Sequence, residues 1–221
     1  MAEAVLAEHY PPIVDMKFMD VDTIPIAGAE CWVSRSGYTG EDGFEISIPH
    51  AAAETVAAAL ADHADVEWIG LGARDSLRLE AGLCLYGHDI DTGKTPVEAG
   101  LTWAIQQSRR AGGSATGGFP GDSIILDQMS QGVSRKRVGL TPQTRAPMRE
   151  GVVLYASEDS STQIGTVTSG GFGPTVEAPV AMGYVATEMA VTGTVLFGEV
   201  RGKRLPIAVS PLPHTPPNFK R

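Results

Sequence analysis

The sequence has little cysteine, no long apolar run and no recognisable targeting signal in its first residues. Its two cysteines, Cys31 and Cys84, stand in apolar surroundings, and no Cys-x-x-Cys or clustered histidine spacing occurs. This pattern predicts two buried structural thiols in a reducing compartment and argues against a metal site. No stretch approaches the about 20 consecutive apolar residues of a membrane helix, so no membrane span is expected. The acidic start lacks the features of a secretory signal or a transit peptide, which predicts a cytoplasmic location.

Basic residues are also scarce. Lysine and arginine together number 17 against 26 aspartates and glutamates, which gives a formal net charge of −9. A general nucleic-acid binder needs basic surface to neutralise phosphates, and an anionic membrane surface attracts the same charge. The charge balance therefore argues against both partners. A length of 221 residues is enough for one large domain or two modest ones.

The first half of the sequence alternates between strand-like and helix-like patterns. Apolar residues at helical spacing predict helices over residues 2–9, 51–63 and 74–84. Loose alternation predicts a hairpin around Gly28 over residues 23–34 and a strand over residues 44–48. This order predicts an α+β layer in which helices pack on a mostly antiparallel sheet.

The second half has a different residue pattern, which begins after a glycine-rich stretch. Residues 111–119 are predicted to be a linker between a domain over residues 1–110 and a domain over residues 120–221. Six short β-like runs follow at intervals of roughly ten residues, as in a β barrel or sandwich. They span residues 136–140, 152–155, 163–168, 180–185, 193–200 and 205–209.

The run Arg35–Glu45 is the strongest functional signal. It holds three glycines, Tyr38 and three carboxylates, and it leads directly into the predicted strand over residues 44–48. Glycine lets the backbone approach a ligand closely, and a carboxylate at the start of a strand is held on a rigid element. Together these groups suit a flat, polar, donor-rich ligand. The alternative is a glycine hairpin with solvated acids.

Further motifs accompany this run in order along the chain. They comprise Gly70–Asp91, Thr95–Trp103, Phe119–Gly121, Arg137–Leu140, Ala146–Arg149, Gly165–Gly170 and Ala181–Val185. Together they resemble the aminomethyltransferase of the glycine cleavage system, the T-protein family, over nearly the whole chain. The resemblance implies two α+β domains and a C-terminal barrel around a folate site. For this chain we expect a partial ferredoxin-like, antiparallel α+β domain followed by a β barrel. A segment of roughly 145 residues, the size of a whole domain, is expected to precede the position of Met1 in the family and to hold the catalytic aspartate.

The resemblance assigns folate-binding roles to three residues and adds two weaker candidates. Glu45 matches the glutamate that binds the pterin ring, where one carboxylate can accept two adjacent N–H groups. Arg74 matches an arginine that contacts folate, and Trp103 matches a tryptophan that lines the folate cavity. Arg137 is a weak candidate for the side that receives the lipoyl partner. Phe219 stands where the family often has a tyrosine near the folate, so a hydroxyl contact is lost.

Each assignment has a plainer alternative. Tyr38 could stack on or edge the ring, and it could equally pack within the turn. Glu45 could be a surface acid at a strand edge, and Trp103 could be a core tryptophan. No catalytic residue and no metal ligand is assigned within these 221 residues.

The implied reaction moves an aminomethyl group from the lipoyl arm of the lipoylated H-protein to tetrahydrofolate. Ammonia leaves and 5,10-methylenetetrahydrofolate forms. Tetrahydrofolate is thus the substrate, no metal is involved, and the present chain is predicted to be inactive alone. The alternatives are a non-catalytic folate-binding module, one half of a split enzyme, the tail of a folate-dependent dimethylglycine or sarcosine dehydrogenase, and a degenerate gene product.

Overall fold

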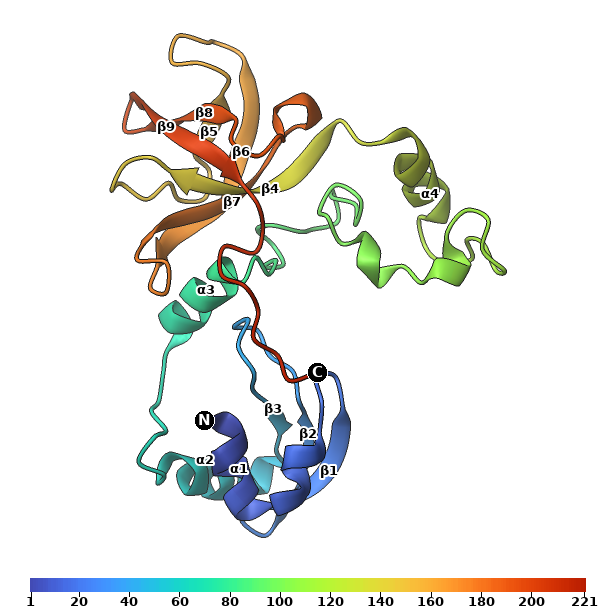
Figure 1. Ribbon diagram of the computed structural model, residues 1–221, viewed down its shortest axis with the longest axis vertical. Helices are drawn as coiled ribbons and strands as arrows, with labels where there is room; N and C mark the ends of the chain where they lie inside the picture. The colour runs from blue at the N-terminus through green and yellow to red at the C-terminus, as the bar shows by residue number, and fades with distance from the viewer. The chain divides into compact units, whose positions relative to one another are not determined.

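The computed structural model describes all 221 residues, and these form two compact units (Figure 1). The first unit comprises residues 1–81 together with residues 215–221, and the second comprises residues 82–214. The seven closing residues therefore pack with the start of the chain. The domain boundaries expected from the sequence stay predictions.

The first unit is a small α+β layer. Its elements are α1 (Ala2–His9), η1 (Pro11–Asp15), β1 (Val21–Ile26), β2 (Ala29–Ser34), β3 (Glu45–Ser47), η2 (His50–Ala52), α2 (Ala53–Ala61) and α3 (Leu71–Glu80). The strands form an antiparallel sheet in the order β1-β2-β3. The predicted hairpin is confirmed, with Ala27 and Gly28 at positive φ in its turn.

The two faces of this sheet differ in character. Side chains alternate along a strand, so every second residue points to the same face. Ile24, Ile26, Cys31 and Val33 are fully buried and pack with apolar residues of α1, η1 and α2. The opposite face carries Val21, Thr23, Trp32, Glu45 and Ser47, all of them exposed. The core thus lies under one face and leaves the other open.

Two predictions for the first 90 residues need correction. The helix predicted over residues 74–84 begins at Leu71 and ends at Glu80, because Gly82 turns the chain at positive φ. Cys31 is a buried thiol as predicted, and burial raises its pKa, but Cys84 is only half-buried.

The second unit contains a closed β barrel. Its elements are η3 (Thr102–Ala104), η4 (Gln107–Arg109), α4 (Asp122–Gln131), β4 (Arg135–Pro142), β5 (Val153–Tyr155), β6 (Gln163–Gly173), β7 (Ala178–Ala186), η5 (Thr187–Met189), β8 (Val195–Val200) and β9 (Lys203–Ser210). The strands run in the order β4-β7-β6-β5-β8-β9, and β9 pairs with β4 to close the barrel. All six predicted strands are present. The α+β class and the barrel are confirmed, whereas α4 was not predicted.

The barrel interior is filled by apolar side chains. Leu140, Met148, Leu154, Leu196 and Ile207 are all fully buried within it. Closure gives every strand two neighbours, so no edge is left unpaired. None of the helices combines the length and apolar character that a membrane crossing requires.

Candidate functional site

A buried arginine fixes the glycine loop that follows β2. Arg35 is only 1% exposed, and its guanidinium donates to both carboxylate oxygens of Asp42, at 3.0 and 2.5 Å. It also donates to the Met16 carbonyl at 2.9 Å, lies 2.6 Å from a Glu3 carboxylate oxygen, and sits 4.9 Å from the centre of the Phe44 ring. The two ends of the loop are therefore held together by ionic and hydrogen bonds.

The charges around this arginine are matched. Hydrogen bonding to Arg35 holds the pKa of Asp42 below its ordinary value, and hydrogen bonds from Lys220 and Arg35 do the same for Glu3. Lys220 belongs to the closing residues, and its backbone N–H donates to Asp42 at 3.2 Å. The loop, the first helix and the C-terminus thus share one ionic network. This role of Arg35 and Asp42 was not predicted from the sequence.

Glu45 is the first residue of β3 and lies on the open face of the sheet. It pairs in register with Ser34 of β2. The Ser36 hydroxyl donates to its Oε2 at 2.7 Å, and Ser36 is itself 2.8 Å from the Ser34 hydroxyl. The strand and the serine pair orient the carboxylate, which stays exposed to solvent. It can therefore accept hydrogen bonds from a ligand.

The structure brings Tyr38 and Arg74 together. The Arg74 guanidinium carbon lies 4.8 Å from the centre of the Tyr38 ring, within the range of a cation–π contact. Arg74 is exposed in the first turn of α3. The close approach depends on Gly40, where an added Cβ would come within 2.7 Å of the Ala81 Cβ at the end of the same helix. The loop and α3 therefore meet through a position that only glycine suits.

The remaining candidates have defined surroundings. Trp103 belongs to the second unit, in η3, and is 76% exposed, so it is not a core tryptophan. Arg137 of β4 donates to the carbonyls of Gly82 and Ala99 at 2.9 and 2.8 Å, which joins the barrel to the segment before it. Phe219 stacks on Phe18 with ring centres 4.1 Å apart. The binding roles suggested for these three residues stay predictions.

A hollow on the open face of the sheet contains Glu45. It measures about 370 Å³ and is lined by Val21, Trp32, Ser34, Glu45 and Ser47, along with Val33. The alternation of β2 indicates that Trp32 points to this face, although Trp32 was not among the predicted site residues. The hollow combines a carboxylate, two hydroxyls and an aromatic side chain, which are groups that can recognise a flat polar ring.

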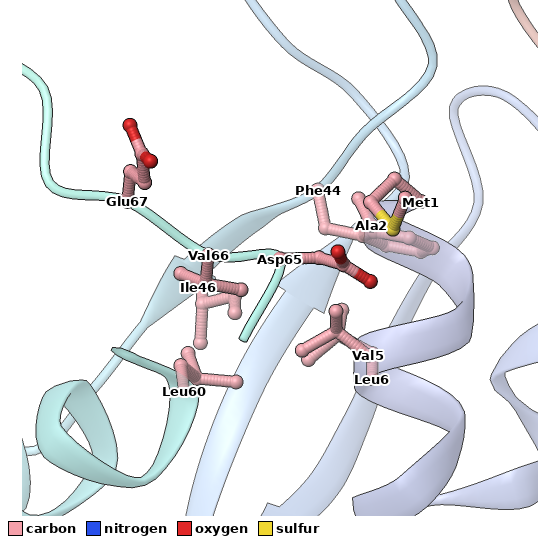
Figure 2. A pocket seen from close by; sticks show the side chains of 10 residues that line it. All are labelled: Met1, Ala2, Val5, Leu6, Phe44, Ile46, Leu60, Asp65, Val66 and Glu67. Atoms are coloured by element: carbon pink, nitrogen blue, oxygen red, sulfur yellow. The ribbon is translucent and has the colours of Figure 1, made fainter. Parts of the chain in front are cut away.

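A second hollow lies under the opposite face of β3. It measures about 350 Å³, and apolar side chains that include Val5, Leu6, Ile46 and Leu60 line most of it (Figure 2). The Glu67 carboxylate points away from the other labelled side chains (Figure 2). This hollow is an opening into the core of the first unit, and the Asp65 carboxylate lies among its apolar side chains (Figure 2).

No metal site accompanies these hollows. The structure contains no group of three or more histidine, cysteine, aspartate or glutamate side chains that could hold a metal ion. The groups of the candidate site that could contact a ligand are therefore the Glu45 carboxylate, the rings of Tyr38 and Trp32, and the Arg74 guanidinium.

Two family models match the chain in succession. The model described as "GCVT N-terminal domain" matches residues 1–109, and the model described as "Glycine cleavage T-protein C-terminal barrel domain" matches residues 135–215. The second match coincides with the barrel strands.

Individual relatives agree with these models. The mitochondrial aminomethyltransferase of Homo sapiens is 46% identical over 205 residues, which cover 92% of this chain and 49% of that protein. The corresponding protein of Dictyostelium discoideum is 44% identical over 95% of this chain and 52% of its own length. The chain spans about half the length of the curated relatives it matches.

A solved structure is also similar. The crystal structure of glycine cleavage system aminomethyltransferase T from Bartonella henselae superimposes with a TM-score of 0.90 at 46% sequence identity. The match covers 99% of this chain and 58% of that one.

Proposed function

The chain belongs to the glycine cleavage T-protein family, and from this premise we propose that it is the folate-binding portion of an aminomethyltransferase. The reaction would transfer the aminomethyl group of a lipoylated H-protein to tetrahydrofolate, with release of ammonia and formation of 5,10-methylenetetrahydrofolate. The observation that carries the proposal is that the glycine loop of the first unit leads into the exposed carboxylate of Glu45 and also holds Tyr38, which contacts Arg74.

The carboxylate of Glu45 has the chemistry to hold the pterin ring. A pterin presents an exocyclic amine beside a ring N–H, and one carboxylate can accept hydrogen bonds from both. Glu45 is exposed, and Ser36 and the strand fix its direction. An oriented acceptor loses little rotamer entropy when the ligand binds, which favours affinity.

The arginine of α3 supplies the complementary charge. Arg74 is a cation at the edge of the same loop, and a guanidinium pairs with a carboxylate in a forked geometry. The carboxylate tail of folate is a suitable partner. The Tyr38 ring, which lies against the guanidinium, restricts the directions in which Arg74 can reach.

The chemistry of the transfer would depend mainly on positioning and charge stabilisation. We assign no proton-transferring residue to residues 1–221, and these residues span only about half of the relatives' length. We therefore propose that they bind folate but do not catalyse the transfer by themselves.

The test is a reconstitution assay. The amino-terminal half of the Bartonella henselae protein would be expressed as a separate chain and mixed with this protein, tetrahydrofolate and aminomethyl-lipoylated H-protein. We expect ammonia and methylenetetrahydrofolate in equal amounts from the mixture and neither product from this chain alone. Reconstituted activity that is unchanged by Glu45→Gln would contradict the proposed site, and full activity of the chain alone would contradict the proposed division of labour.

The cellular location stays a separate proposal. The relatives described above from Homo sapiens and Dictyostelium discoideum are mitochondrial proteins by name. For this chain the cytoplasmic location stays a proposal. Fractionation of the producing cells, followed by immunodetection, would check it.

A further inference from the structure

The tryptophan on the open face of the sheet takes no part in the core of the first unit. Trp32 lies on the central strand, and its side chain is 69% exposed. A single exposed apolar residue is ordinary on a protein surface and means little by itself. Trp32 differs because it lines the same hollow as Glu45.

The neighbours of Trp32 leave its ring accessible. In register it lies opposite Thr23 on one side and Ser47 on the other, and both are small. Neither can cover an indole. The tryptophan is therefore a free aromatic surface that stands above the sheet, beside an acceptor.

The register also fixes its relation to the carboxylate. Glu45 pairs with Ser34, which is two residues from Trp32 on the same strand. Residues in this diagonal relation on one face lie within reach of an aromatic side chain. Ser34 and Ser47, both with short side chains, occupy the other two corners of this square, and all four residues line the same hollow.

We propose that Trp32 is an aromatic wall of the pterin site, against which the ring packs while its N–H groups donate to Glu45. The inference rests on the proposed function, since it takes a reduced folate as the ligand. It adds Trp32 to the proposed folate site because of its place in the hollow and its strand register. Stacking suits a reduced pterin because its pyrimidine ring is flat and carries the amine and the ring N–H at its edge.

The size of the effect follows from measurements on stacked heterocycles. Removing an aromatic residue on which a nucleobase stacks costs about 1–3 kcal/mol, which corresponds to about 5- to 150-fold in affinity. We expect a loss in this range for Trp32→Ala. The loss should be largely reversed in Trp32→Phe, which keeps a flat ring.

Titration of the chain with 5-formyltetrahydrofolate, followed by calorimetry, tests the proposal. Trp68 provides the matched control, because it is 76% exposed and lies on the segment between α2 and α3 rather than on the sheet. We expect weaker binding in Trp32→Ala and wild-type affinity in Trp68→Ala.

The remaining outcomes separate this inference from the proposed function. If Trp32→Ala binds like the wild type while Glu45→Gln does not, folate binds at Glu45 and the stacking role of Trp32 is wrong. Equal losses in Trp32→Ala and Trp68→Ala would also overturn it, as would a Trp32→Phe variant as weak as Trp32→Ala. A wild-type chain that does not bind the folate would overturn the folate site and the inference together.

Discussion

Replacing Asp42 should destabilise the first unit. The Asp42 side chain is not one of the groups assigned to ligand binding. Asp42 accepts two hydrogen bonds from the Arg35 guanidinium and one from the Lys220 backbone. In Asp42→Ala the guanidinium stays in the interior and keeps only the Met16 carbonyl and Glu3 as polar partners. The variant therefore leaves a buried cation with half of its neutralising charge.

The magnitude follows from the burial of the pair. Breaking a buried ion pair by removing one partner costs about 3–5 kcal/mol, and exposed pairs contribute about 0–1 kcal/mol. Arg35 is buried but Asp42 is about a quarter exposed, so the expected loss lies between these limits, at about 2–3 kcal/mol. Asp42→Asn keeps the shape and loses the charge, and it should cost about 1.5–2 kcal/mol.

The assay is hydrogen exchange of the β1–β3 amides, which reports on the first unit separately from the barrel. The neighbouring Glu41 is the matched control, because it is exposed and forms no ion pair; Glu41→Ala should stay within about 0.5 kcal/mol of the wild type. Equal protection in Asp42→Ala and Glu41→Ala would refute the reasoning. So would an Asp42 variant that loses folate affinity at unchanged stability.

Three further outcomes are expected. The depressed pKa of Asp42 means that this carboxylate binds a proton more readily in the unfolded chain than in the folded one. Its contribution to the free energy of unfolding is therefore fully present above about pH 4 and is lost as the pH drops further. Acid unfolding of Asp42→Asn should show a shallower pH dependence than that of the wild type. Asp89 is fully buried and accepts hydrogen bonds from the hydroxyls of Thr168 and Ser169, so Asp89→Ala should lower the free energy of barrel unfolding in urea by about 2–3 kcal/mol. In Gly170→Ala the new methyl group would overlap the Met148 carbonyl, and the near-ultraviolet circular dichroism of the barrel should be lost.

Regular patterns made much of the fold predictable. The barrel strands are short β-like runs that turn residues separate at regular intervals, so their number and order could be predicted from the sequence. The helix α4 escaped prediction because it follows a glycine-rich stretch and buries only Ile125, which leaves little periodicity to detect. The start of α3 was misplaced because Gly70 and Gly72 flank its first residue, and glycine is a poor helix former.

The site was predictable only in part. Glu45 and Tyr38 lie in one recognisable run, but the contact between Tyr38 and Arg74 joins residues far apart in the sequence. It depends on the close approach of Gly40 to Ala81, which no local pattern reveals. The role of Arg35 was hidden for a similar reason, since Glu3 comes from the first helix and the Met16 carbonyl from the segment before β1.

The central claim is that the first unit holds the pterin-binding carboxylate of the family at Glu45. Thermal unfolding of the chain with and without 5-formyltetrahydrofolate tests it most directly. Ligand at about 100 times its dissociation constant should stabilise the native state by about 2.7 kcal/mol, and Glu45→Gln should abolish the shift while leaving the ligand-free melting temperature unchanged. An unshifted wild type, or an equal shift in Glu45→Gln, would contradict the account.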